Sequence, residues 1–210
     1  MSETKFVEFP NFGYLTAKFT DEELLPVKKE IKKIKSNFSK YEKFNHNLVG
    51  QIKEEYKITE SLTSLHKLII PFVLEYEKKY NFVDTVYRFD TFPKRYEMDS
   101  VWVNFQKKHE FNPCHSHTGV LSFVIWINIP YLREDEDDKN LASIQTKGSF
   151  HFVFSNILGI NNMYDIPLNK EYENVMILFP SQLVHEVYPF YTSNDYRISL
   201  AGNIRLARNL

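Results

Sequence analysis

The chain has 210 residues, of which 43% are hydrophobic and 16% aromatic, which is enough apolar material for one packed domain of ordinary size. Its 26 Lys and Arg residues nearly balance its 27 Asp and Glu residues, so the net charge of -1 indicates no general attraction to nucleic acid or to an anionic membrane. The single cysteine, Cys114, excludes an internal disulfide framework and is typical of a reducing compartment.

Targeting signals are not apparent in the sequence. The N-terminal segment lacks the basic start and apolar run of a secretory signal peptide. The longest apolar stretch, residues 120–130, is too short to span a bilayer and is interrupted by Ser122 and Asn128. We therefore expect a cytoplasmic protein without a membrane span.

The N-terminal part of the chain carries apolar residues at helical spacing. Thr20 and Glu23 form a capping-box pattern, which predicts the start of an amphipathic helix that continues to about Phe38. A second helix is expected over residues 59–80, where Pro71 should kink or divide it. We predict that residues 1–82 form a helical support region packed on the outer face of the core.

From residue 83 onward, short runs of high β propensity alternate with turns. The expected strands are residues 85–89, 100–106, 120–129, 149–155, 175–179, 186–190 and 196–204. Strands that follow one another without helices between them favour a sandwich or jelly roll over a parallel α/β sheet. The predicted fold class is mainly β with N-terminal helices, and residues 83–210 are expected to form a double-stranded β-helix (cupin-like jelly-roll) core within one structural domain.

Three histidines in this β-rich half are candidate metal ligands. His115 and His117 precede an apolar strand, and residues i and i+2 of an extended chain point to the same side. His185 lies 70 residues after His115, immediately before another predicted strand. Two neighbouring nitrogens and one from a distant strand can form a facial ligand set, which suits Fe(II) and also Zn, Cu or Ni.

Arg197 and Ser199 form a second pair at i and i+2 on a predicted strand. A guanidinium deeper in the barrel can hold a dicarboxylate end-on through two charge-assisted hydrogen bonds, and the Ser199 hydroxyl can add a third. Because alternate residues of a strand point to the same face, further polar side chains are expected to point into the core near the ligand. Asn104, Gln106 and Ser122 are expected either to hydrogen-bond the ligand or to orient it, or else to pair with neighbouring backbone.

The segments NFQKKHEFNPCHSHTGVLSFVIWINIP and MILFPSQLVHEVYPFYTSNDYRISLAGNI resemble the 2-oxoglutarate/Fe(II)-dependent oxygenase superfamily. They are most similar to small prolyl-hydroxylase-like proteins of bacteria and phages, and the resemblance covers about residues 100–204. It implies Fe(II) and 2-oxoglutarate as cofactor and co-substrate, with O₂ as oxidant. It also implies that His185 is the distal iron ligand, that Arg197 and Ser199 bind 2-oxoglutarate, and that the location is the cytoplasm of a bacterium or of a phage-infected cell.

The first ligand pair departs from the pattern of this family. The family's H-x-D falls on His115 and His117, so a histidine replaces the usual carboxylate. We expect a site of three histidines, with a carboxylate arriving from elsewhere as the alternative. Glu186 should point to the opposite face of its strand, and Glu110 is a more distant candidate.

The resemblance implies hydroxylation of a bound substrate with release of succinate and CO₂. The primary substrate, whether a peptide (including peptidyl proline) or a small molecule, is not apparent from the sequence, and neither is the oligomeric state. Two other functions are considered. One is a metal-binding cupin-like isomerase or binding protein without oxygenase activity, and the other is a scaffold in which the histidines are incidental.

Overall fold

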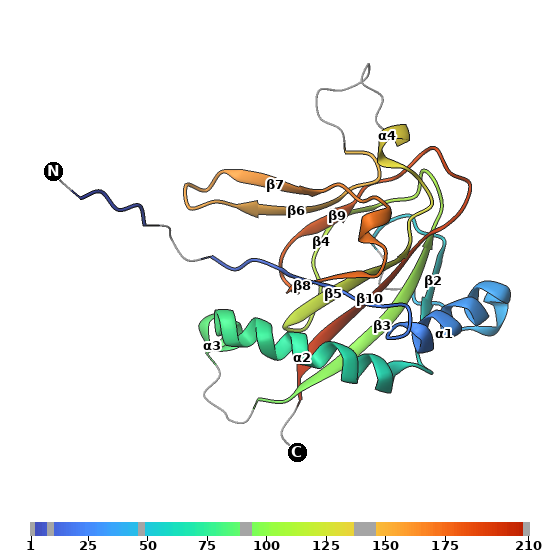
Figure 1. The fold of residues 1–210 in the computed structure, drawn as a ribbon, viewed down its shortest axis with the longest axis horizontal. Helices are drawn as coiled ribbons and strands as arrows, with labels where there is room; N and C mark the ends of the chain where they lie inside the picture. Colours follow the sequence, from blue (N-terminus) through green and yellow to red (C-terminus); the bar gives the residue numbers. More distant parts are fainter. Residues whose placement is uncertain (1–2, 8–10, 46–48, 89–93, 137–145, 208–210) are drawn as a thin grey trace.

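The computed structural model describes residues 3–7, 11–45, 49–88, 94–136 and 146–207, and it consists of two antiparallel sheets with helices on one side (Figure 1). The larger sheet has the order β1-β8-β5-β10-β3-β2. Its strands are β1 (Leu15–Lys18), β8 (Val175–Pro180), β5 (Leu121–Asn128), β10 (Arg197–Leu206), β3 (Tyr96–Gln106) and β2 (Glu54–Lys57). The smaller sheet has the order β4-β9-β6-β7, with β4 (Asn112–His115), β9 (His185–Val187), β6 (Phe150–Ser155) and β7 (Asn161–Ile166).

Strands of the larger sheet are buried on both faces, and their side chains alternate between two apolar clusters. On β5, Val124 and Trp126 pack in the cluster between the two sheets, whereas Leu121 and Ile125 pack in the cluster under the helices. This alternation follows from the two-residue period of a strand, and it explains why β5 reads as a continuous apolar run. The inner cluster also contains aromatic residues from β6 and β8, which are Phe150, Phe152 and Phe179.

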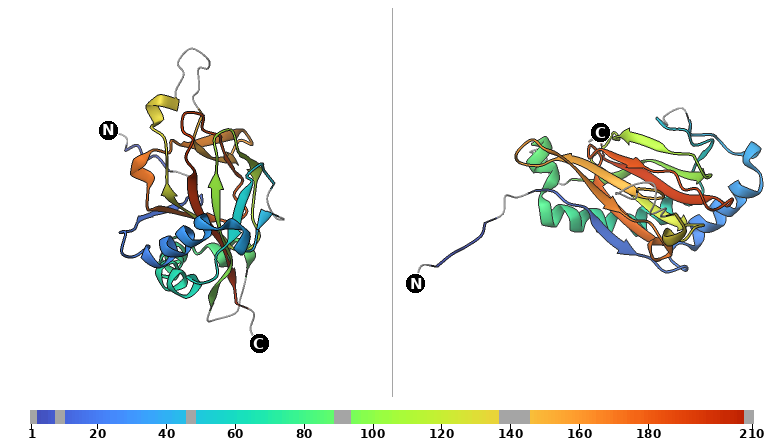
Figure 2. Two further views of the ribbon diagram at one scale, coloured as in Figure 1. Left: turned by 90° about the vertical axis from the view of Figure 1, so that its right-hand side faces the viewer. Right: turned by 90° about the horizontal axis from the view of Figure 1, so that it is seen from above.

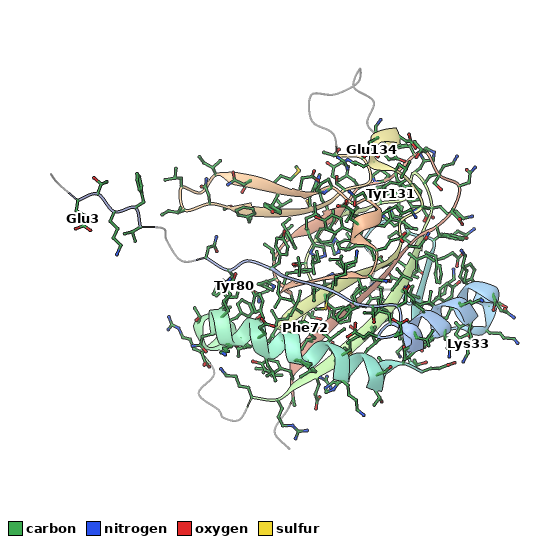
Figure 3. The ribbon with its side chains drawn as sticks, viewed as in Figure 1. Glu3, Lys33, Phe72, Tyr80, Tyr131 and Glu134 are labelled. Carbon is green, nitrogen blue, oxygen red and sulfur yellow. The ribbon has the colours of Figure 1, made fainter. Side chains whose placement is uncertain are left out.

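The helices cover the face of the larger sheet that points away from the smaller one (Figures 1 and 2). They are α1 (Leu25–Ser36), α2 (Leu62–Tyr80) and α3 (Phe82–Tyr87). The buried stripe of α2 is Leu65, Ile69, Val73 and Tyr76. Phe72 of the same helix, labelled in Figure 3, meets Phe19 edge-to-face at a centroid distance of 5.5 Å. Shorter helices are α4 (Arg133–Glu136) and the 3₁₀ turns η1 (Phe38–Lys40) and η3 (Lys170–Tyr172). Within the described residues, no helix combines the length and the apolar character needed to cross a membrane.

The predicted fold class is confirmed. The reciprocal hydrogen bonds of the capping box form, because the Glu23 carboxylate accepts from the Thr20 backbone N–H at 2.8 Å and the Thr20 hydroxyl accepts from the Glu23 N–H at 3.2 Å. They close a turn ahead of the helix, and α1 itself begins at Leu25 with Leu24 as its N-cap residue. Pro71 does not divide α2. The N-terminal segment 1–82 also supplies both edge strands of the larger sheet, β1 and β2, which the sequence did not predict.

The strand predicted at residues 85–89 is wrong, because residues up to Tyr87 belong to α3. Asn81 takes a left-handed conformation (φ 44°) that ends α2 and redirects the chain. The first turn of α3 then buries Phe82 and Val83 in the apolar cluster under the helices. Burial of these two residues outweighs the local β propensity of the segment.

A buried carboxylate joins α1 to the start of α2. Glu30 is 2% exposed, and its oxygens accept hydrogen bonds from the backbone N–H groups of Thr59, Glu60 and Ser61 at 2.7–2.9 Å. The Ser61 hydroxyl donates a fourth bond at 2.6 Å. These N–H groups precede the first turn of α2, where intrahelical acceptors are missing and a negative charge is favourable.

Replacing Glu30 by Ala should lower the free energy of unfolding by about 3 kcal/mol or more, because several buried donors lose their acceptor. Urea denaturation measures this change. The matched control, Glu22→Ala, removes an exposed carboxylate just before α1 and should change stability by no more than about 0.5 kcal/mol. Equal effects of the two substitutions would contradict the proposed role of Glu30 as the anchor of α2.

Candidate metal centre

A cavity of about 500 Å³ lies between the two sheets. Strand pairing arranges the side chains of its larger wall in rows that cross β2, β3 and β10. One row contains Glu55, Asn104 and Ser199, and the next contains Lys57, Trp102 and Ala201. Because partners in a row sit on the same face of the sheet, all six side chains border the cavity.

The smaller sheet brings the three predicted histidines together. His115 on β4 lies directly opposite His185 on β9 in the strand register. One nitrogen from each of His115, His117 and His185 lies within 4.8 Å of the others, and the Nε2 atoms of His117 and His185 are 3.2 Å apart. Two nitrogens bound to neighbouring positions of one ion at about 2.1 Å are roughly 3 Å apart, so this spacing fits a shared metal ion.

The hydrogen bonds of these imidazoles favour metal binding. The Nδ1 atoms of His115 and His185 lie 2.7 Å and 3.0 Å from the carbonyl oxygens of Pro113 and Leu183, so each Nδ1–H donates to backbone. This tautomer leaves the Nε2 lone pair as the acceptor of each ring, and in His115 that atom lies 3.1 Å from Asn112 Nδ2, which a metal ion would displace. Burial lowers the pKa of His115, lowers that of His117 to about 4 and lowers that of His185 well below its usual value. All three rings are therefore neutral near pH 7, as a metal ligand must be.

Among the described residues, no carboxylate joins this group of histidines. Glu186 points away as expected, since its oxygens contact His151 Nδ1 and Cys114 Sγ at 3.2 Å. Glu110 accepts from the backbone N–H groups of Lys53 and Lys107. The Cys114 side chain is exposed beside Glu186 and does not point toward the histidines.

Arg197 is a buried cation whose partners are all neutral. It is 2% exposed, and all five of its N–H groups donate to oxygen atoms. Gln106 Oε1 accepts from both Nε (3.0 Å) and Nη2 (2.7 Å), so it occupies the side of the guanidinium that commonly binds a carboxylate. The other acceptors are the Tyr131 hydroxyl and the carbonyls of Gly148 and Tyr188. Figure 3 shows Tyr131 near α4, which places this end of the site there.

A buried charge without an opposite charge is costly, so the cavity side of Arg197 is suited to an anion. Within the described part of the chain, no carboxylate pairs with Arg197. Ser199 also borders the cavity, and its Oγ lies 3.5 Å from Asn104 Nδ2. The donor set therefore fits a carboxylate group bound from the cavity.

The remaining predicted residues divide into two groups. Asn104 borders the cavity, and its Oδ1 is buried without a hydrogen-bond partner. Gln106 is not part of the cavity lining in this conformation, and both ends of its amide are engaged, Oε1 with Arg197 and Nε2 with the Glu110 carbonyl at 2.5 Å. Ser122 is also outside the cavity lining, and its hydroxyl bonds with Ser181 and Asn203 at 2.9 Å.

Sequence reasoning missed Glu55 and the aromatic wall beside His117. Glu55 on β2 is 3% exposed and borders the cavity. Trp102 lies 5.5 Å from the ring of His117 and stacks on Phe44 at 5.3 Å. Phe179 and Phe150 enclose His185 at 5.0 Å and 5.3 Å. The alternation of Glu55 and Lys57 on a short strand was the one available signal, and it became meaningful only once β2 was seen to pair with β3.

The amino-acid sequence of the chain also matches a known protein family. Residues 100–203 match the sequence model of a family described as "Putative 2OG-Fe(II) oxygenase", and this range contains the three histidines, Arg197 and Ser199. No protein with a curated description matches the chain significantly in sequence.

Solved structures share the fold at low sequence identity. A prolyl-4-hydroxylase from Pseudomonas putida is 11% identical, with a TM-score of 0.58 and coverage of 94% of each chain. A viral collagen prolyl hydroxylase from Paramecium bursaria Chlorella virus-1, solved as a 2OG complex, is 13% identical, with a TM-score of 0.54 and coverage of 92% of this chain and 96% of the other. HygX from Streptomyces hygroscopicus, with nickel, 2-oxoglutarate and hygromycin B bound, is 10% identical, with a TM-score of 0.53 and coverage of 92% and 83%.

The family match carries the assignment, and the solved structures support the fold alone. The match spans the strands that supply the three histidines and the buried arginine, and it identifies an Fe(II)- and 2-oxoglutarate-dependent enzyme. It also favours oxygenase activity over the cupin-like and scaffold alternatives. Through residues 100–203, the chain belongs to the 2-oxoglutarate/Fe(II)-dependent oxygenase family.

Proposed function

We propose that the enzyme hydroxylates a primary substrate while converting 2-oxoglutarate to succinate and CO₂, and that His115, His117 and His185 hold the Fe(II). Arg197 and Ser199 are proposed to bind the distal carboxylate of 2-oxoglutarate. One observation carries the proposal, namely that three converging imidazoles border the same cavity as a buried guanidinium that has no carboxylate partner among the described residues. These groups supply opposite ends of a binding site for a chelating dicarboxylate.

Bound iron supplies the activation of O₂ that couples decarboxylation of the co-substrate to oxidation of a C–H bond. The residues of the chain supply positions and surroundings. The carbonyls of Pro113 and Leu183 fix the orientation of two imidazole ligands. Phe150 and Phe179 pack around His185 and keep water from that side of the metal site.

Binding of the distal carboxylate requires an exchange at Arg197. The carboxylate would replace Gln106 Oε1 at the Nε and Nη2 atoms, exchanging a neutral acceptor for a charged one. Tyr131 and the carbonyls of Gly148 and Tyr188 hold the rest of the guanidinium in place during this exchange. A fixed guanidinium loses less conformational entropy when the ligand binds, and this favours tight binding.

The primary substrate is part of the proposal. Two of the similar structures are prolyl hydroxylases, so peptidyl proline is one candidate. Hygromycin B is bound in the third, which makes a polar small molecule an equal candidate. The chemistry of the cavity wall distinguishes between substrate classes better than the fold does.

Substitution of Arg197 tests the co-substrate site. Arg197→Gln should weaken 2-oxoglutarate binding by about 100-fold, because it removes a buried charge–charge contact. Arg197→Lys should weaken it by about 10-fold, because the charge remains but the two-pronged contact is lost. The measurement is the visible charge-transfer band during anaerobic titration with Fe(II) and 2-oxoglutarate.

The matched control is Arg205→Gln, which removes a guanidinium from the same strand that is 49% exposed and pairs with Glu97 and Asp99. This variant should bind 2-oxoglutarate within about twofold of the wild type. Arg197→Lys keeps the buried charge, so it stays informative if Arg197→Gln fails to fold. Unchanged 2-oxoglutarate affinity in folded Arg197→Lys and Arg197→Gln would exclude the assigned role.

A further inference from the structure

Glu55 is a buried carboxyl group at the wall of the cavity, and no described residue pairs with it. It is 3% exposed, and neither a hydrogen bond nor an ion pair joins its side chain to any described residue. Burial alone raises the pKa of this carboxyl to about 7. An ionisable group kept in such surroundings costs stability, and such groups concentrate at functional sites.

The cations that border the same cavity have other partners. Lys57, two residues along β2, reaches outward to Glu42 at 3.4 Å. Arg197 donates all of its N–H groups to the neutral oxygens described above. The other carboxylate at the cavity wall, Asp99, pairs with Arg205 at 3.0 Å. Among the described residues, Glu55 is thus the carboxyl group of this cavity wall that has no charged partner.

The neighbours of Glu55 complete a site for a hydrogen-bond donor. Asn104 is its direct partner across the β2–β3 pair, and Asn104 Oδ1 is buried with no partner. The side chain of Trp102 follows on the same face of β3, and Phe44 stacks on it. Two unpaired acceptors beside an aromatic wall form the combination that binds a positively charged nitrogen.

The site around Glu55 lies apart from the proposed binding site of 2-oxoglutarate. Glu55 is on the edge strand β2, and two strand spacings, about 10 Å, separate β2 from β10, which carries Arg197 and Ser199. A dicarboxylate would avoid an ionised Glu55 and prefer Arg197. Trp102 links the Glu55 side to the metal centre, because its ring lies 5.5 Å from that of His117.

We propose that Glu55, with Asn104 Oδ1 and the aromatic wall of Trp102 and Phe44, binds a positively charged nitrogen of the primary substrate. The substrate is therefore an amine or guanidine compound, or a peptide that presents a lysine or arginine side chain. This inference rests on the proposed function, since it assigns the cavity beside the metal centre to the primary substrate. It makes Glu55 a specificity-determining residue.

The test compares two small probes of matched size, n-butylammonium and 1-butanol. The full chain is loaded with Zn(II) and 2-oxoglutarate so that no turnover occurs, and binding is measured by ligand-detected NMR. The wild type should bind n-butylammonium about 10-fold more tightly than 1-butanol, because a buried ion pair with hydrogen bonds favours the cation. In Glu55→Gln the two affinities should lie within about twofold of each other.

Glu97→Gln is the matched control, because it removes a surface carboxylate of β3 that pairs with Arg205. This variant should keep the full preference for the cation. Glu55→Gln removes a buried charge, so its thermal unfolding temperature should be no lower than that of the wild type, and this measurement verifies folding. Equal binding of both probes by the wild type, or an unchanged preference in Glu55→Gln, would overturn the proposal.

A third probe, Nα-acetyl-lysine N-methylamide, distinguishes the two sources of the cation. Binding at least as tight as that of n-butylammonium supports a peptide-borne lysine, and clearly weaker binding supports a free amine. The readout is independent of the co-substrate test. A cation preference that persists without Zn(II) and 2-oxoglutarate, in a protein whose Arg197 variants bind 2-oxoglutarate normally, would reject the proposed co-substrate site and keep the cation site.

Discussion

The pairing of β4 with β9 is the constraint on which the site depends. It places His115 directly opposite His185, and the chain between β4 and β5 then brings His117 to the same point. A slip of one residue in this register would turn His185 to the other face, where Glu186 contacts His151 and Cys114. Aromatic packing of His185 against Phe150 and Phe179 makes such a slip unfavourable. The metal centre is thus fixed by the core of the jelly roll.

The charges of the cavity follow from the sheet in a similar way. Arg197 and Glu55 are both almost fully buried, and in the described residues neither has an oppositely charged partner. Each is costly to the folded protein without a ligand, and the two lie on different strands of the same wall. A dicarboxylate at Arg197 and a cation at Glu55 would compensate both charges, and the cavity would then hold its two ligands on either side of Asn104.

The candidate metal ligands and the buried arginine could be predicted because each belongs to a short pattern in the sequence. His115 with His117, and Arg197 with Ser199, are pairs at i and i+2, a spacing that acquires meaning as soon as a strand is assumed. The jelly roll could be predicted from the order of short strands. In contrast, Gln106 and Ser122 were expected to meet the ligand, and strand parity could not show that their hydrogen bonds are taken by Arg197 and by Ser181 with Asn203.

Glu55 could not be predicted because its role depends on a long-range pairing. The segment EEYK has no strong strand pattern, and it becomes part of the wall only by adding to the edge of β3, which is distant in the sequence. The α3 segment was misread because tertiary burial of Phe82 and Val83 overrides local propensity. Local periodicity therefore predicts the histidine cluster, whereas the cavity wall around Glu55 depends on the assembled sheet.

The most direct test of this account is X-ray absorption spectroscopy of the Fe(II)-loaded protein, which counts imidazole ligands through their outer-shell scattering. The account predicts three imidazoles in the wild type, two in His117→Ala and three in His109→Ala, in which a histidine absent from the cluster is removed. It would be contradicted by a wild-type spectrum with two imidazoles, or by an unchanged count in His117→Ala, because either result would mean that His117 is not a ligand.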